Sequence, residues 1–162
     1  MSDAWYAISA LGSPELWLII ILAFFLFYFA VRHRWKKSKK FKGFMFILVP
    51  SIILVMVLAY SVKASVQLPR PCIPCPAEGC NPYCVSDSTF PSGHAATIFA
   101  AVTAVFLGLE KRKCLLLYAI AFAVSYSRVA LGVHTWLDIA GGAVLGIAVA
   151  IAVKEADKKV VH

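Results

Sequence analysis

The stretch "FMFILVPSIILVMVLAYSV", residues 44–62, contains no charged residue. Its length is close to the roughly 20 apolar residues that an α-helix needs to cross a bilayer. The rest of the chain has the same character, since 61% of its 162 residues are hydrophobic and only 15% are charged. Such a composition lies far outside the range of soluble globular domains. The sequence therefore predicts an all-α integral membrane protein.

Four further apolar segments complete a predicted compact bundle of about five transmembrane helices. The expected spans are residues 15–32, 43–62, 93–110, 114–131 and 135–154, within a single domain over residues 1–162. The first segment is interpreted as a retained helix and not as a signal peptide, because acidic residues precede it and a basic cluster follows it.

Lysines and arginines gather at one set of helix ends. Seven lie in residues 32–42, three in residues 111–113 and three in the tail, at Lys154, Lys158 and Lys159. All of them follow an odd number of spans, so the positive-inside rule assigns them to the cytoplasm. The prediction is a multi-pass plasma-membrane protein with its N-terminus outside and its C-terminus inside. The net charge of +8 is then mainly a topology signal, and no nucleic-acid partner is expected.

Four cysteines fall in the loop 68–89, which this topology assigns to the outside. They occupy "PCIPCPAEGCNPYC" at Cys72, Cys75, Cys80 and Cys84. An oxidising compartment favours two disulfides, for which three pairings are possible. A four-cysteine zinc or iron–sulfur site is the alternative, because the first spacing is C-x2-C, although the other spacings fit no standard pattern closely.

Three cations remain for the outer face, at Lys63, Arg70 and Arg128. The first two lie in "KASVQLPRP", where Pro69 and Pro71 restrict the backbone around the arginine through their fixed φ. Taken singly, either cation could be a side chain that snorkels to the interface or contacts a lipid headgroup.

The segment "FPSGHAAT", residues 90–97, predicts the start of the third span. Ser92 is a natural N-cap, Gly93 lets a ligand approach the backbone closely, and His94 lies in the first turn. A helix that begins here directs its free N–H groups and its positive dipole end outward, which makes an anion site. A capped helix start with an interfacial histidine is the alternative.

The segment "SRVALGVHTWLD", residues 127–138, adds Arg128 and a histidine and an aspartate four residues apart. His134 and Asp138 would share one face of a helix. A carboxylate at that spacing can accept the imidazole Nδ1–H, fix the tautomer and leave Nε2 free to attack. Ionisable residues at membrane depth indicate a functional site, although a buried structural pair would show the same spacing.

All three segments fall at the outer ends of predicted spans and can therefore form one pocket. That pocket would be rich in cations, which suits a strongly anionic substrate such as a phosphate. The remaining outer acids, Glu78 and Asp87, are interpreted as solvated loop residues and not as metal ligands. We therefore expect metal-free chemistry without a cofactor.

The patterns K-x6-R-P (63–71), P-S-G-H (91–94) and S-R-x5-H-x3-D (127–138) resemble the three signature motifs of the type 2 phosphatidic acid phosphatase superfamily. All three match without a departure. That superfamily includes membrane lipid phosphatases, glucose-6-phosphatase, soluble acid phosphatases and vanadium haloperoxidases. Many membrane members have six spans, whereas five are predicted here.

The resemblance implies a role for each matching residue. His134 would be the nucleophile that forms a phosphohistidine, Asp138 would orient it, and His94 would protonate the leaving oxygen and then activate water. The groups that would hold the phosphoryl oxygens are Lys63, Arg70, Arg128, the Ser92 hydroxyl and the Gly93 backbone N–H. Phosphoryl transfer depends mainly on such positioning and charge neutralisation.

The expected function is hydrolysis of a membrane lipid phosphate or diphosphate at the outer leaflet, with a polyprenyl diphosphate such as undecaprenyl diphosphate as the favoured substrate. Phosphatidylglycerophosphate, phosphatidic acid and a lipid A-type phosphate are close competitors. From another class, a non-catalytic protein that binds or transports a lipid phosphate is the main alternative, and a phosphotransferase is a further one. The sequence does not specify the lipid or the oligomeric state.

Overall fold

The computed structural model describes residues 2–35, 39–73, 81, 83–108 and 115–160. Within these ranges the regular structure is entirely helical, with no strand. The helices are α1 (Ser2–Ala10), α2 (Pro14–Trp35), α3 (Lys39–Val66), α4 (Gly93–Gly108), α5 (Leu115–Ala130) and α6 (Trp136–Val160). The all-α prediction is confirmed for this part of the chain.

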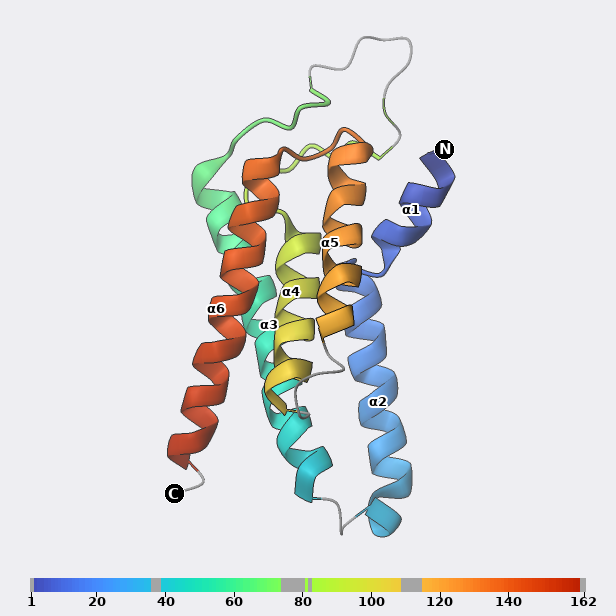
Figure 1. Ribbon diagram of the computed structural model, residues 1–162, viewed down its shortest axis with the longest axis vertical. Helices are drawn as coiled ribbons and strands as arrows, with labels where there is room; N and C mark the ends of the chain where they lie inside the picture. Colours follow the sequence, from blue (N-terminus) through green and yellow to red (C-terminus); the bar gives the residue numbers. More distant parts are fainter. Residues whose placement is uncertain (1, 36–38, 74–80, 82, 109–114, 161–162) are drawn as a thin grey trace.

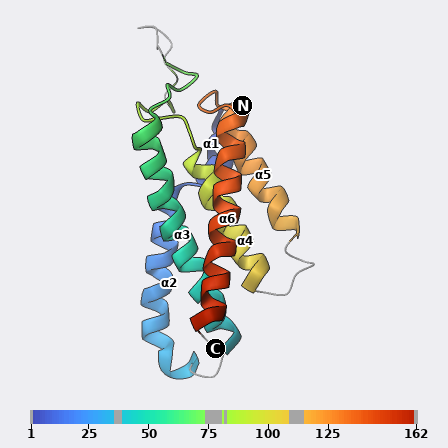
Figure 2. The same ribbon diagram turned by 90° about the vertical axis from the view of Figure 1, so that its left-hand side faces the viewer.

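Helix α4 occupies the centre of the bundle. It packs against α3, α5 and α6, as the two views show (Figure 1, Figure 2). Its sequence is rich in alanine, and nearly every side chain from Ala95 to Ala104 is buried. Small side chains let neighbouring helices approach closely where no hydrophobic effect between helices is available. The composition of α4 thus accounts for its central position.

Two glycines of α6 make the closest helix contact of the bundle core. A Cβ atom on Gly142 would lie only 2.5 Å from the Ser92 carbonyl oxygen, and one on Gly146 would overlap the Ala96 carbonyl oxygen. Both glycines lie in "GGAVLG", residues 141–146, whose small-xxx-small spacing allows such a close contact between helices. It brings the start of α6 against the start of α4, where the Ser92 N–H donates to the Asp138 carbonyl oxygen at 3.0 Å.

The N-terminal segment contains a helix that the sequence analysis did not predict. Helix α1 mixes polar and apolar residues, so it does not extend the apolar run that begins in α2. The two helices meet at an angle of 47°. Gly12 lies at the break, where a Cβ atom would be 2.5 Å from Val124 Cγ1 and 3.2 Å from the His94 carbonyl oxygen. The bend therefore brings the N-terminal segment against α4 and α5.

By length and composition, two helical segments could each cross a membrane alone, Met45–Val66 and Trp136–Lys159. The bent pair of Ala4–Ala10 and Pro14–Ala23 could form a third crossing, whereas α4 and α5 are apolar but shorter. Many large apolar side chains face outward, among them Phe25, Leu116 and Val144. These features confirm a helical membrane protein, while the count of five crossings stays a prediction.

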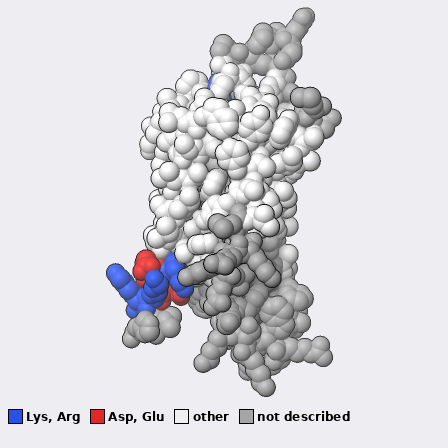
Figure 3. Space-filling view, viewed as in Figure 1, with Lys and Arg blue, Asp and Glu red and all other residues white. Residues whose placement is uncertain are grey.

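The ends of the bundle differ in charge. In the face shown in Figure 3, charged side chains gather at the lower end of α6, and the rest of the described surface is almost free of them. The charged residues of that end are Lys154, Glu155, Asp157, Lys158 and Lys159. The two termini lie at opposite ends of the molecule (Figure 1). This arrangement agrees with the expected topology, and the side that each end faces stays a prediction.

Candidate active site

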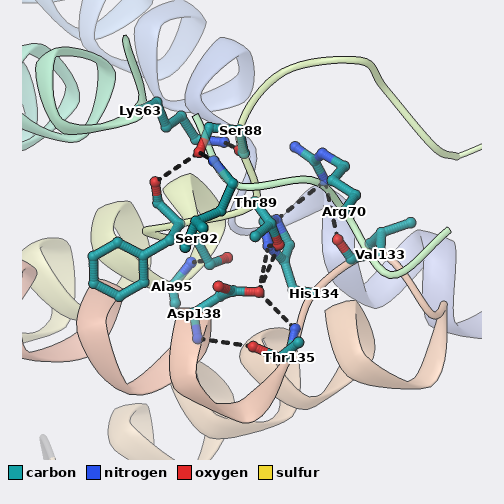
Figure 4. A network of polar contacts seen from close by, with 12 residues as sticks. Lys63, Arg70, Ser88, Thr89, Ser92, Ala95, Val133, His134, Thr135 and Asp138 are labelled. Atoms are coloured by element: carbon teal, nitrogen blue, oxygen red, sulfur yellow. Dashed lines mark hydrogen bonds and ion pairs between the residues drawn. The ribbon is translucent and has the colours of Figure 1, made fainter. Parts of the chain in front are cut away.

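The three sequence motifs meet at the end of the bundle that lies opposite the charged end of α6 (Figure 1). The last turn of α3 carries Lys63, the following loop carries Arg70, and the turn between α5 and α6 carries His134. Figure 4 shows these side chains converging with Ser92 and Asp138. The pocket expected from the sequence is thus assembled, with each motif contributing from a different element.

A histidine, a threonine and an aspartate form the centre of this network (Figure 4). Asp138 Oδ2 lies 3.5 Å from His134 Nδ1. The Thr89 hydroxyl donates to the same Oδ2 at 2.6 Å, and its oxygen lies 3.3 Å from His134 Nδ1. The Thr135 backbone N–H also donates to Oδ2 at 2.6 Å. Because it accepts these bonds, the buried carboxylate of Asp138 is stabilised in its ionised form.

Arg70 defines which nitrogen of His134 carries the proton. Its Nη1 donates to the Val133 carbonyl oxygen at 3.2 Å and lies 3.3 Å from His134 Nε2. A guanidinium can only donate, so Nε2 must be the acceptor and Nδ1 holds the proton. That proton faces Thr89 and Asp138, which leaves the lone pair of Nε2 directed at the cations.

The surroundings of His134 also keep its ring neutral. Burial, followed by the positive charges of Arg70 and Arg128, lowers the pKa of the His134 imidazole below its ordinary value. A neutral imidazole whose Nε2 carries a lone pair is the form that can act as a nucleophile.

Asp87 corrects one interpretation made from the sequence. Its side chain is about half exposed, yet it accepts from Lys63 Nζ at 2.7 Å and from Arg70 Nε at 2.9 Å. Partial burial opposes its charged form, but the hydrogen bonds from the two cations outweigh this and lower the pKa of the Asp87 carboxyl. Asp87 is therefore an ion-paired part of the site and not a merely solvated loop residue. Glu78 lies outside the described residues.

Arg128 lies in the last turn of α5. The residue is only 7% exposed, and its Nη1 donates to the Ser9 hydroxyl oxygen at 2.7 Å. Its Nε is buried and has no hydrogen-bond partner within the described part of the chain. A buried guanidinium with an unused donor is suited to a bound anion.

The start of α4 has the form that the sequence predicted. Ser92 is fully buried, and its hydroxyl oxygen accepts from the Ala95 N–H at 3.5 Å. A Cβ atom on Gly93 would meet no atom within 4 Å, so the space beside the helix start is open. His94 follows in the first turn and is partly exposed. Free N–H groups and the positive end of the helix dipole therefore border an open space.

A disulfide cross-links the loop between α3 and α4, which carries Arg70 and Asp87. Cys72 is bonded to Cys84, and the pair lies between Arg70 and Asp87 in the sequence. The loop is also attached to the turn after α5, because Asn81 Nδ2 donates to the Leu131 carbonyl oxygen at 2.6 Å. One disulfide of the expected framework is thus present, and the predictions for Cys75 and Cys80 lie outside the described residues.

Three residues of this network were not anticipated from the sequence. Thr89 directly precedes the segment from Phe90, so a polar side chain next to the second motif was its only signal. Asp87 was dismissed for lack of a partner nearby in the sequence. Ser9 lies 119 residues from Arg128, and no local pattern connects them.

A helical membrane bundle with a neutral histidine, an orienting carboxylate and three cations at one end has the features of a membrane phosphatase. Residues 44–161 match the model of the PAP2 superfamily, so the chain belongs to that family. The resemblance seen in the three motifs is confirmed. The membrane members of this family named above are phosphatases, which makes phosphatase the enzyme class of this chain.

Solved structures of the family have the same fold. The structure of LpxE from Aquifex aeolicus gives a TM-score of 0.72 at 28% sequence identity, over 95% of this chain and 85% of that one. A transmembrane PAP2-type phosphatidylglycerolphosphate phosphatase from Bacillus subtilis gives a TM-score of 0.68 over 98% of this chain and 77% of that one. At 24% identity, this second likeness shows the fold alone.

A curated relative matches over a shorter region. The bacitracin transport permease protein BcrC of Bacillus licheniformis is 43% identical over 61 residues. The match covers 38% of this chain and 30% of the length of that protein.

Proposed function

We propose that this chain is a metal-independent phosphatase that hydrolyses a lipid phosphate or diphosphate through a phosphohistidine at His134. One observation carries the proposal. His134 Nε2 lies 3.3 Å from Arg70 Nη1, while Nδ1 faces Thr89 and Asp138. The nucleophilic lone pair therefore points toward a donor that would also bind the phosphoryl oxygens.

In the first chemical step, Nε2 of His134 attacks phosphorus and the bond to the leaving oxygen breaks. His94 donates a proton to that oxygen as general acid. The imidazole of His134 becomes a cation when it is phosphorylated, and the buried carboxylate of Asp138 balances this charge. In the second step, a water molecule gives its proton to His94, attacks phosphorus and releases phosphate with the original His134.

The phosphoryl oxygens would be held by five groups that surround this centre. They are the side chains of Lys63, Arg70, Arg128 and Ser92 and the backbone N–H of Gly93. Fixed cations in a partly dry site are more effective than the same charges in water, because their interactions are less screened. The unused Nε of Arg128 and the open space beside Gly93 support this assignment.

Within this class we favour a polyprenyl diphosphate as the substrate and the outer leaflet of the plasma membrane as the location. The charged end of α6 (Figure 3) lies at the opposite end of the bundle from the end of α3 and the turn between α5 and α6, which carry the site (Figure 1). This is the arrangement that the positive-inside rule gives for an extracytoplasmic site. Phosphatidylglycerophosphate, phosphatidic acid and a lipid A-type phosphate remain the competing substrates.

A cavity of about 540 Å³ next to the site can accommodate part of a lipid headgroup. Its lining contains the charged residues Lys63 and Asp87 and larger side chains that include Tyr60, Leu68 and Ile73. Tyr60 is 76% exposed on the outer surface of α3. A polar site bordered by an exposed apolar surface supports a lipid substrate over a small soluble ester.

The test is phosphate release from a polyprenyl diphosphate by detergent-purified protein in the presence of EDTA, with His134→Ala as the comparison. We expect release by the wild type, inhibition by vanadate and loss of release in the variant. The same assay with the three competing lipids ranks the substrates. Vanadate binding without phosphate release from any of them would reject the enzyme and favour a lipid-phosphate binding protein.

A further inference from the structure

We infer that Ser9 is a positioning residue for Arg128 and that α1 thereby completes the phosphate-binding pocket. The inference rests on the proposed function, since it assigns a role in holding the phosphoryl group. It concerns a segment outside the residues that match the family, which begin at residue 44.

The contact between Ser9 and Arg128 is direct and buried. Ser9 is 1% exposed, and its hydroxyl oxygen accepts from Arg128 Nη1 at 2.7 Å. The bond holds one edge of the guanidinium, while the buried Nε has no partner within the described part of the chain. Arginine has a flexible side chain whose ordering costs free energy on binding, so a side chain fixed in advance binds an anion more tightly.

The hydrogen bonding of Ser9 differs from that of the serines of α3. Ser51, Ser61 and Ser65 each donate to the backbone carbonyl four residues earlier in their own helix. Such a bond is the usual solution for a serine inside a helix. The hydroxyl of Ser9 instead accepts a hydrogen bond from Arg128 of α5. This contact between two helices indicates that Ser9 does more than form a local hydrogen bond.

Helix α1 is held in place by contacts with three other parts of the site. Trp5 packs edge-on against Tyr126 with ring centroids 5.3 Å apart, and Tyr6 stacks on Tyr83 of the cysteine-rich loop at 4.8 Å. Two residues after the helix, Gly12 lies so close to the start of α4 that a Cβ atom on it would be 3.2 Å from the His94 carbonyl oxygen. These contacts connect α1 to α5, to the loop and to the start of α4. A helix fixed at these points can position Arg128 accurately.

The experiment measures the dissociation constant of orthovanadate, a phosphate mimic, by a titration that does not depend on turnover. Ser9→Ala removes the acceptor but keeps a good helix former. Ser51→Ala is the matched control, because Ser51 is also fully buried and hydrogen-bonded but lies in the bundle core. We expect Ser9→Ala to weaken vanadate binding about tenfold, as for the loss of one hydrogen bond to a charged group, and Ser51→Ala to leave it unchanged.

A second comparison separates positioning from a general structural effect. Arg128→Lys keeps a cation but removes the Nη1 that Ser9 contacts. In that background, Ser9→Ala should weaken vanadate binding by less than about twofold if it acts through Arg128. An equal loss in both backgrounds, or wild-type affinity in Ser9→Ala, would overturn the inference. Vanadate binding by the wild type without phosphate release would reject the proposed function alone, and absence of vanadate binding would reject both.

Discussion

The Thr89 hydroxyl lies between the two groups of the proposed catalytic pair, close to both His134 Nδ1 and Asp138 Oδ2. Thr89→Val keeps the shape of the side chain but removes this hydroxyl. Asp138 then loses a donor and the imidazole loses a contact that fixes its orientation. We expect kcat to fall by about tenfold or more with little change in KM.

Steady-state kinetics of phosphate release check this prediction, with Thr89→Ser as the control because it retains the hydroxyl. A wild-type kcat in Thr89→Val would show that Asp138 orients His134 without a contribution from the Thr89 hydroxyl.

Gly93 and Gly142 allow two roles of a glycine to be compared, namely leaving space for a bound phosphate and allowing close helix packing. A Cβ atom on Gly93 meets nothing within 4 Å, whereas one on Gly142 lies 2.5 Å from the Ser92 carbonyl oxygen. We expect Gly93→Ala to keep the thermal stability of the wild type but to bind vanadate more weakly. Gly142→Ala should lose about 1–3 kcal/mol of stability through overpacking.

Thermal unfolding and vanadate titration of both variants distinguish these effects. Equal destabilisation of the two variants, with unchanged vanadate affinity in Gly93→Ala, would contradict the assignment of the Gly93 N–H to the phosphate site.

At the scale of single residues, sequence patterns predicted the groups whose positions are set within one helix or one short motif. The spacing of four residues brought His134 and Asp138 together, and Ser92 precedes a helix as predicted. His134 nevertheless lies in the turn before α6, which begins at Trp136, so the two side chains do not share a helix face as the sequence analysis expected. Thr89 and Asp87 depend on the path of a loop, for which the sequence offers no comparable rule.

At the scale of elements, the loop that joins α3 to α4 determines where Arg70 lies. The Cys72–Cys84 disulfide closes a segment of that loop across a sequence separation of 12. A disulfide that closes a loop of this size lowers the conformational entropy of the unfolded chain, which stabilises the folded protein by about 3 kcal/mol. We expect the Cys72→Ser, Cys84→Ser double variant to lose kcat/KM several-fold while its helix content stays unchanged.

Phosphate release and far-UV circular dichroism on the same sample check this prediction, and reduction of the wild-type protein supplies a parallel comparison. Full activity without the disulfide would show that the ion pairs of Asp87 and the bond from Asn81 are sufficient to hold the loop.

The sequence predicted the long apolar helices, but it did not predict the short helix α1. The tight contact of Gly142 and Gly146 followed from their spacing, which is a local signal. Helix α1 is held by the aromatic contacts of Trp5 and Tyr6 and by the bond from Arg128. These contacts are distant in sequence, so the pattern of α1 alone did not indicate a helix.

At the scale of the whole molecule, His134 makes stability depend on pH. Because burial and neighbouring cations lower its pKa in the folded protein, the unfolded chain binds more protons below its ordinary value of about 6.5. Stability should therefore decrease as the pH falls below about 6.5, by up to about 1.4 kcal/mol per pH unit from this one group.

Thermal unfolding of detergent-solubilised protein between pH 7.5 and 4.5 measures the effect. His134→Gln, which cannot take up the proton, should lose less stability over this range than the wild type. Parallel profiles for the two proteins would mean that the pKa of His134 is the same in the folded and the unfolded protein, which would contradict the lowered value.

The site lies at one end of a bundle whose described surface, in the face of Figure 3, carries few charged residues apart from the end of α6. Many large apolar side chains are exposed along the bundle. Trp136 and Leu137, next to the proposed nucleophile, are 54% and 70% exposed. A substrate whose tail stays among such side chains meets the enzyme by lateral diffusion in two dimensions. Its reaction rate should then follow the mole fraction of substrate in a mixed micelle, so that added detergent slows turnover even when the bulk amount of lipid is constant.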